Sequence, residues 1–291
     1  MKQFPIGLVS VFHNSEDVAQ KFCEHVSALN VAQVVVVDAG STDSTLEILK
    51  RFPEIQVISC ENVGFGNANN LGASKVTQPW LMFVNPDLFI LRNDLETLFD
   101  FSSNLVQRSI TSTRMYQIID ERRRYTRESR FEGTFVERPK VSGALMLMQS
   151  SLFSDLEGFD QNIFLYFEEI DLCWRARKLG AKVLVLGTAE AEHMRAASAP
   201  SSDKYLYLRA WHDGWSKSYF QAKHSRSKLH SLFLRSKSIA QSLVKYLTAL
   251  LMGRGSKAYR EKHKAKGMID QIRGISAFEG GQGRHYKVSG K

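Results

Sequence analysis

Short apolar runs alternate with longer segments of helical pattern through the N-terminal part of the chain. Ile6–Phe12, Val34–Val37, Gln56–Ser59 and Trp80–Val84 have the length and composition of buried strands. The segments between them carry helix signals, such as Ser15 followed by acidic residues in a first turn. Strands that alternate with helices predict an α/β fold with a doubly wound, mostly parallel sheet and helices on both faces.

The pattern changes after a further predicted helix, Asn93–Leu105. Residues 110–140 are first rich in Thr and Ser and then in Arg, which predicts one or two β-hairpins or a mobile basic loop. We interpret these arginines as a solvated face rather than a specific site. Val141–Met148 and Val183–Leu186 predict two more strands, and His193 is expected in a polar loop after the second of them.

Three carboxylates open a predicted amphipathic helix within Phe164–Gly180, FLYFEEIDLCWRARKLG. Acids at the start and bases at the end suit the helix dipole, so ordinary capping accounts for Glu168 or Asp171 alone. It accounts less well for Glu168, Glu169 and Asp171 together beside an aromatic run. Apolar neighbours and like charges raise a carboxyl pKa, which favours a general base near neutral pH.

Polar residues follow the predicted strands at their carboxyl ends, where ligands bind in sheets of this type. They are His13-Asn14, Asp38 and Asn85-Pro86-Asp87. Asp38 is either a turn residue or an acceptor for a nucleobase or sugar group. Asn85-Pro86-Asp87 is either a simple turn or a rigid oxygen ligand for Mg²⁺ or Mn²⁺.

The segment Asn62–Lys75 carries glycines and asparagines that suggest ligand contacts. Gly64 and Gly66 resemble a dinucleotide fingerprint, but the third glycine is misplaced, so we reject that interpretation. Asparagine is a poor helix former, and its amide can both donate to and accept from ribose, phosphate or sugar hydroxyls. Asn67, Asn69 and Asn70 are therefore candidate ligand contacts.

Composition bounds the class of protein. The 291 residues are 43% hydrophobic, which suffices for a full core. The three cysteines lack metal-ligand spacing and are expected to be buried thiols in a reducing compartment. The segment MKQFPIGLVSVF lacks a long apolar core, and no apolar stretch approaches 18 residues, so we expect neither a signal peptide nor a transmembrane helix.

The net charge of +9 is unevenly distributed. Residues 1–203 carry 20 Lys and Arg against 26 Asp and Glu (20 − 26 = −6), whereas residues 204–291 carry 19 against 4 (19 − 4 = +15). Within the basic part, Lys228–Met252 has leucines at helical spacing interleaved with lysines and arginine. This segment predicts a helix that packs on the protein or a second subunit, or one that lies on an anionic membrane.

Several motifs in order resemble family 2 glycosyltransferases, and in particular the bacterial rhamnosyltransferases of surface-polysaccharide assembly. The motifs are VVVVDAGSTDST, ENVGFGNANNLG, FVNPD, SGALMLM, LEGFDQNIFLYFEEIDLCWRARKLG and the downstream His193, and they cover about residues 4–195. The resemblance implies the GT-A fold and inverting transfer of a sugar from a nucleoside diphosphate donor. From this resemblance together with the charge and leucine pattern of the C-terminal part, we expect a catalytic domain over residues 1–225 and a basic helical extension over 226–291. The end of the extension, 274–291, contains several glycines and is expected to be disordered.

The resemblance also implies roles for residues. Phe12, His13, Asn14 and Asp38 would line the nucleotide pocket. Asn85 and Asp87 stand where the family has an Asp-x-Asp motif, with a single carboxylate at Asp87 toward a metal and the diphosphate. The other implied contacts are Gly143 and Ala144 beside the donor sugar, His193 near the metal, and Glu169 as the base in a position where many members have Asp, with Glu168 or Asp171 as alternatives.

The expected cofactor is a divalent cation, Mg²⁺ or Mn²⁺. The expected partners are a nucleoside diphosphate sugar, a saccharide or lipid-linked acceptor, and an anionic membrane surface on the inner face of the cell membrane, with the protein in the cytoplasm. The oligomeric state stays open. Two alternatives are a catalytically silent sugar-nucleotide binder and a nucleic-acid-binding protein, although no nucleic-acid-binding module is present.

Overall fold

The computed structural model describes residues 3–194 and 203–280, which fall into two compact units. We call them the sheet unit, up to Asp160 and again from Glu168, and the helical unit, Gln161–Phe167 together with the residues from Asp203 onward. The division near residue 200 differs from the expected boundary at 225. It does so because the helix over 203–223 packs against the later helices.

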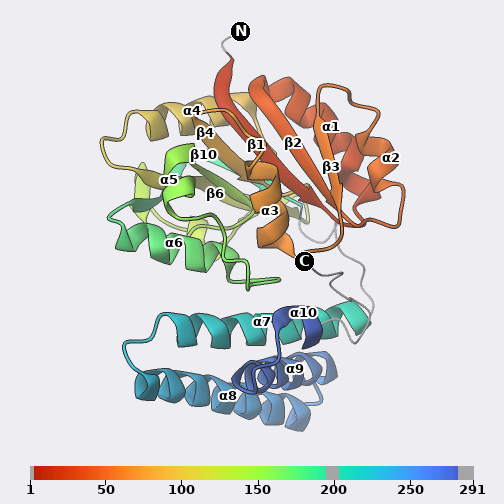
Figure 1. Ribbon diagram of the computed structural model, residues 1–291, viewed down its shortest axis with the longest axis vertical. Coiled ribbons are helices and arrows are strands. Elements are labelled where there is room, and N and C mark those ends of the chain that lie inside the picture. Colours follow the sequence, from red (N-terminus) through yellow and green to blue (C-terminus); the bar gives the residue numbers. More distant parts are fainter. Residues whose placement is uncertain (1–2, 195–202, 281–291) are drawn as a thin grey trace. The chain divides into compact units, whose positions relative to one another are not determined.

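The sheet unit is built on one mixed sheet (Figure 1), whose described strands run in the order β3-β2-β1-β4-β9-β6-β10-β5, with β7 paired to β6 and β8 to β10. The strands β1, β2, β3 and β4 are mutually parallel, β10 is parallel to β6, and β9 runs antiparallel to both β4 and β6. The strands are β1 Phe4–Phe12, β2 Val31–Ala39, β3 Gln56–Cys60, β4 Trp80–Val84, β5 Leu88–Ile90, β6 Ser109–Ile119, β7 Arg122–Tyr125, β8 Phe135–Glu137, β9 Leu145–Gln149 and β10 Lys182–His193.

Helices cover both faces of the sheet, as predicted. Successive strand residues point to opposite faces, so Leu8 joins one apolar cluster and Val9 the other. The first cluster includes Phe22 and Leu95 from α1 and α4, and the second includes Leu172 from α6. The helices of this unit are α1 Glu16–Leu29, α2 Thr45–Leu49, α3 Phe65–Ala73, α4 Arg92–Ser103, α5 Ser150–Asp155 and α6 Glu168–Lys178, with a short 3-10 turn η1 Arg127–Ser129.

Two local predictions meet different outcomes. The expected hairpin within residues 110–140 is confirmed as β6 and β7. The prediction that His193 lies in a polar loop is wrong, because β10 continues through Glu192 to His193, which pairs with Leu88 of β5. That pairing holds His193 in a defined backbone position. The hydrophobic pattern did not predict this part of the strand, because polar residues such as Glu190 and Glu192 interrupt it.

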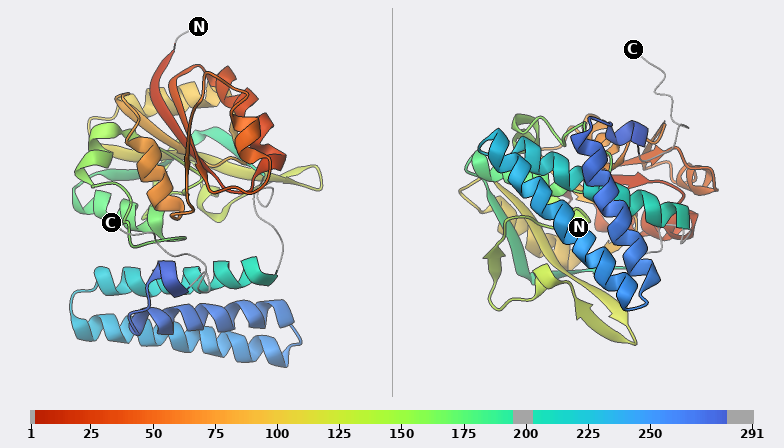
Figure 2. Two further views of the ribbon diagram at one scale, coloured as in Figure 1. Left: turned by 45° about the vertical axis from the view of Figure 1, so that its right-hand side comes forward. Right: turned by 90° about the horizontal axis from the view of Figure 1, so that it is seen from below.

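The helical unit consists mainly of α7, α8 and α9, which pack against one another (Figure 2). Two glycines allow α7 and α9 to approach closely, since a Cβ on Gly214 would overlap the carbonyl of Lys264, and one on Gly267 would overlap that of Trp211. Trp211 is fully buried, and its indole donates to Asp270 at 2.9 Å. These helices are α7 Asp203–Lys223, α8 Lys228–Leu251, α9 Gly255–Ile272 and the single turn α10 Ala277–Gly280.

The segment Gln161–Phe167 contributes its aromatic side chains to this unit. Phe164 stacks on His212 with ring centroids 4.8 Å apart, and Ser216 donates to the Leu165 carbonyl at 2.9 Å. Burial lowers the pKa of His212 to about 4, so this ring is neutral in the fold. Ala277–Gly280 is helical within the region 274–291 that we expected to be disordered, and residues 281–291 lie outside those described.

We predict that Gly214→Ala and Gly267→Ala each destabilise the helical unit by about 1–3 kcal/mol or more, because the added methyl meets backbone of the facing helix, which cannot rotate away. Urea denaturation followed by circular dichroism would measure the change. Gly255→Ala in α9 is the matched control, since nothing lies near its Cβ position, and it should be neutral or slightly stabilising. Equal stability of all three variants would refute the close contact.

Candidate functional site

The carboxyl ends of β1 and β2 bring the first group of predicted residues together. Phe12 and Asp38 are register partners, and Nδ1 of His13 lies 2.8 Å from the carbonyl oxygen of Ala39. Asn14 adopts φ = 50° and its side chain accepts from the backbone of Thr42 at 2.7 Å. The two loops are thus tied to each other. The prediction that Phe12 lines a nucleotide pocket is not met, because its side chain is fully buried in the first apolar cluster, with its ring 5.1 Å from that of Phe22.

Asp38 is almost fully buried at this edge. Its Oδ2 accepts a long hydrogen bond of 3.4 Å from the Ser41 amide, whereas its Oδ1 has no hydrogen-bond partner among the described residues. A buried carboxylate oxygen without a partner is costly, and a ligand donor would relieve that cost. Asp38 can therefore serve both predicted roles, with Oδ2 accepting from the turn at Ser41 and Oδ1 available to a ligand donor.

The turn after β4 connects to the strand β9. The amide of Asn85 donates to the carbonyl of Ala144 at 2.9 Å, which extends the β4–β9 ladder by one step. Asp87 follows and is buried, with Nε2 of His193 3.2 Å from its Oδ1. The angle is not that of a hydrogen bond, so this oxygen lacks a hydrogen-bond partner among the described residues. The structure therefore places the His193 ring beside the Asp87 carboxylate, and a metal at this position stays a prediction.

Glu169 stands next to Gly143. A Cβ on Gly143 would lie 3.5 Å from the Cβ of Glu169. The backbone of Gly143, in the segment that precedes β9, therefore lies close to the Glu169 side chain at the start of α6. Ala144 in turn accepts from Asn85. One continuous set of neighbours thus runs from the Asn85–Asp87 turn through Ala144 and Gly143 to Glu169, and these residues lie far apart in sequence.

Lys140 pairs with Glu169, at 3.6 Å between its Nζ and Oε1 of the glutamate, and pattern analysis did not identify it. Burial raises the pKa of Glu169, and the Lys140 ammonium opposes that rise. The carboxyl group is therefore more basic than an exposed glutamate while it keeps one cationic neighbour. No motif marks Lys140 in the sequence. Only its position directly before the predicted strand Val141–Met148 could have suggested it.

The two neighbouring acids have other surroundings. Glu168 is buried against α3, where a Cβ on Gly66 would meet its Cγ at 3.2 Å. Asp171 is fully buried and binds Arg175 at 2.7 Å, and the same guanidinium donates to the carbonyls of Leu156 and Gly158. Asp171 therefore fastens α6 to the preceding turn, which leaves Glu169 as the acid of the three that adjoins the Gly143 backbone.

Asn70 also has a structural role in place of the expected ligand contact. Its amide nitrogen donates to the carbonyl of Phe159 at 2.9 Å, and its oxygen accepts from the Phe159 amide at 2.8 Å. Asn67 and Asn69 bond to backbone carbonyls one turn earlier in α3, those of Val63 and Phe65. The side chains of these three asparagines therefore bind backbone groups in and around α3, which explains their presence without a ligand.

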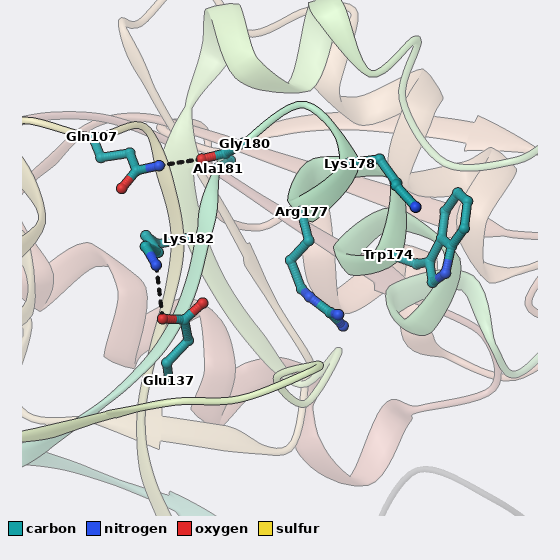
Figure 3. Close-up of a pocket in the computed structure, with 8 residues that line it drawn as sticks. All are labelled: Gln107, Glu137, Trp174, Arg177, Lys178, Gly180, Ala181 and Lys182. Atoms are coloured by element: carbon teal, nitrogen blue, oxygen red, sulfur yellow. Dashed lines mark hydrogen bonds and ion pairs between the residues drawn. The ribbon is translucent and has the colours of Figure 1, made fainter.

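A pocket of about 400 Å³ lies at the opposite end of α6 from Glu169 (Figure 3). Arg177 and Lys178 project from the last turn of the helix, and Lys182 pairs with Glu137 at 2.9 Å. None of the predicted site residues lines this pocket. Its cations sit where a helix C-terminus favours them, so its composition needs no ligand to account for it.

An open α/β sheet with polar groups at its carboxyl edge and a partly buried carboxylate near them is typical of an enzyme that binds a polar ligand at that edge. The chain belongs to glycosyl transferase family 2, whose profile matches residues 8–171. It is therefore a glycosyltransferase, and an inverting mechanism is typical of that family.

Curated relatives agree with the family assignment. The chain is 26% identical over 221 residues to the rhamnosyltransferase WbbL of Escherichia coli, which covers 65% of this chain and 83% of that protein. It is 27% identical over 235 residues to the N-acetylglucosaminyl-diphospho-decaprenol L-rhamnosyltransferase of Mycobacterium tuberculosis, which covers 62% and 76%. The rhamnosyltransferase-like resemblance is thereby confirmed.

Solved structures confirm the GT-A fold. The mannosyltransferase PcManGT of Pyrobaculum calidifontis, in complex with GDP-Man and Mn²⁺, aligns with a TM-score of 0.57 at 12% identity, over 94% of this chain and 88% of that one. Staphylococcus aureus TarS 1-349 aligns with a TM-score of 0.54 at 14% identity, over 92% and 91%. Identities this low concern the fold alone.

We predict that Lys140→Met raises the pKa of Glu169 further. The ammonium stabilises the charged carboxylate, so its removal favours the protonated form while burial remains. A ¹³C-carboxyl NMR titration of Glu169 would measure the shift. Lys182→Met, which removes a lysine paired with Glu137 instead, is the control and should leave the Glu169 titration unchanged. An unchanged Glu169 pKa in Lys140→Met would contradict the pairing.

Proposed function

We propose that the protein transfers a sugar, with rhamnose as the first candidate, from a nucleoside diphosphate donor to a saccharide or lipid-linked saccharide in cell-surface polysaccharide synthesis. The observation that supports this most is the neighbourhood of Glu169, Gly143, Ala144 and Asn85 beside the Asp87–His193 pair. The names of the two rhamnosyltransferase relatives support the sugar, and that of the decaprenol enzyme supports a lipid-linked acceptor.

Glu169 is the proposed general base. The acceptor oxygen forms a bond to the anomeric carbon as Glu169 takes its proton, and the bond from that carbon to the diphosphate oxygen breaks. The nucleoside diphosphate leaves with the electron pair of the broken bond, and the anomeric configuration inverts. This partly buried carboxylate suits the role because desolvation raises its pKa, while its 19% exposure leaves it open to an acceptor.

Asp38, His13 and Asn14 are proposed to hold the nucleotide, and Gly143 and Ala144 the donor sugar. The Oδ1 atoms of Asp38 and Asn85, both buried and without hydrogen-bond partners among the described residues, could accept from ligand donors. Direct backbone approach at Gly143 requires the absence of a side chain there.

The residues present fit a divalent cation, Mg²⁺ or Mn²⁺, in part. Asp87 offers a buried carboxylate oxygen and His193 a ring nitrogen close to it. The described residues contain no cluster of three or more such ligands, so the donor diphosphate would complete the coordination. The cation would stabilise the negative charge that develops on the departing diphosphate. Asp87 and His193 would hold and orient it.

The proposed setting is the cytoplasm, at the inner face of the cell membrane, where a lipid-linked acceptor is presented. An anionic membrane surface is the proposed partner of the basic C-terminal part. Family membership favours this reaction over the silent binder and the nucleic-acid-binding protein. A panel of nucleotide sugars, screened for thermal stabilisation and then for release of the nucleoside diphosphate, would identify the donor.

Glu169→Gln should leave the donor dissociation constant nearly unchanged and lower turnover by roughly 10²-fold or more, because the amide is isosteric but cannot take the proton. Steady-state assays with the donor found in the screen, together with calorimetric titration, would separate binding from catalysis. Glu47→Gln, at an exposed position on α2, is the matched control. Near-normal turnover in Glu169→Gln would reject Glu169 as the base.

Asp87→Asn should abolish the tightening of nucleoside diphosphate binding by Mn²⁺, an effect of about 10-fold or more in the unmodified protein, because the cation loses its charged ligand. Calorimetric titration with Mn²⁺ and with a chelator would show it. Asp17→Asn, on the exposed side of α1, should retain the tightening. The cation role would be refuted if the unmodified protein bound the diphosphate equally with and without Mn²⁺.

A further inference from the structure

The helix α8 presents an apolar stripe to solvent along its whole length. Leu229, Phe233 and Leu251 are 80%, 61% and 90% exposed. With a rotation of about 100° per residue, these positions fall on one face of the helix. The exposed apolar members of this face, which we call the α8 stripe, are Leu229, Leu232, Phe233, Leu243, Val244, Leu247, Leu250 and Leu251.

The opposite side of α8 is lined by small residues. Ser231, Ser238, Ser242 and Ala249 are its buried positions, and Gln221 of α7 donates to Ser238 at 2.9 Å. The polarity of the helix is therefore the reverse of that in an ordinary bundle, with small and mostly polar residues inside and large apolar residues outside. Each large side chain forgoes about 1.5–3 kcal/mol that full burial would bring. A run of such positions on one face is typical of a surface that a protein partner or a membrane covers.

The charges beside the α8 stripe favour an anionic membrane over a second copy of the helix as the partner of this surface. Lys228 and Lys237 lie beside the stripe on α8, which contains no Asp or Glu. Arg235 instead donates to Gln271 of α9, and Lys245 lies on the side of the helix opposite the stripe. Lys237 projects next to one edge of the stripe and Lys228 next to the other, by their angular positions on the helix. A second copy of this helix packed on the stripe would bring like charges together, whereas anionic lipid headgroups would neutralise them at about 1 kcal/mol per residue.

The length and hydropathy of α8 favour insertion in the plane of the interface. Among the residues that the structure describes, no helix is both long and apolar enough to cross a membrane. A large apolar stripe with basic flanks is instead typical of helices that lie flat at the boundary between headgroups and acyl chains. Long lysine side chains there can extend toward the headgroups while their stems cover apolar surface.

We propose that the α8 stripe docks on an anionic lipid bilayer, with Phe233 and the leucines inserted below the headgroups and Lys228 and Lys237 bound to lipid phosphates. This surface is a property of the helical unit, and it does not depend on the identity of the donor or on the transfer chemistry. It would hold the enzyme where a lipid-linked acceptor lies.

The test uses the full-length protein and unilamellar vesicles of phosphatidylcholine alone or with 40% phosphatidylglycerol. Flotation should recover the protein with the anionic vesicles and leave it free with the neutral ones, in a manner that weakens as salt rises. Phe233→Ser combined with Leu247→Ser should lower the recovered fraction at least 10-fold, since both side chains are exposed and contribute to the α8 stripe. Circular dichroism should show an unchanged fold.

Two further variants distinguish the contributions. Val106→Ser, at an exposed apolar position of the sheet unit, is the matched control and should bind vesicles like the unmodified protein. Lys228→Gln combined with Lys237→Gln should lose the preference for anionic lipid, since these two exposed lysines flank the stripe. The proposal is overturned if vesicles do not bind the protein, or if light scattering shows a dimer that the Phe233 and Leu247 changes dissociate, because a second copy would then cover the stripe.

Discussion

The antiparallel insertion of β9 beside β4 is the constraint on which the site depends. It carries the chain at Gly143 and Ala144 to the turn that contains Asn85 and Asp87, and the Asn85–Ala144 hydrogen bond joins the two directly. The same insertion puts β9 next to β6, and β6 in turn holds β10, whose last residue is His193. Without β9 in this position, neither the Gly143 backbone nor His193 would lie at the carboxyl edge of the parallel strands.

Burial and a neighbouring charge have opposite effects on the pKa of Glu169. Desolvation raises the pKa of Glu169, and the Lys140 ammonium at 3.6 Å limits that rise. Asp171, two residues and about half a turn further along the same helix, is fully buried, pairs with Arg175 and holds α6. Neighbouring acids in one helix thus have different physical roles, because one adjoins the Gly143 backbone and the other faces the core.

The helical unit is stabilised by a different means from the sheet unit. Its α7 and α9 approach through Gly214 and Gly267, and its α8 packs through serines and an alanine, so close backbone contact adds to the burial of Trp211 and Trp215. Gln161–Phe167 belongs to this unit, and Tyr166 and Phe167, both with positive φ, directly precede Glu168. A strained pair of residues therefore leads into the helix that carries Glu169.

The sequence by itself determined the alternation of strands and helices, the family resemblance, the acids at the start of α6 and the basic C-terminal part, because these follow from local hydrophobic period and residue type. Only the tertiary structure decided which acid adjoins Gly143, that His193 ends a strand beside Asp87, and that Asn70 holds the backbone of Phe159. It also showed that α7 belongs with α8 and α9, and that the leucines of α8 face outward while its serines face inward. Periodicity shows that a helix has two faces, but which face is buried depends on partners distant in the chain, and those contacts exist only in the folded molecule.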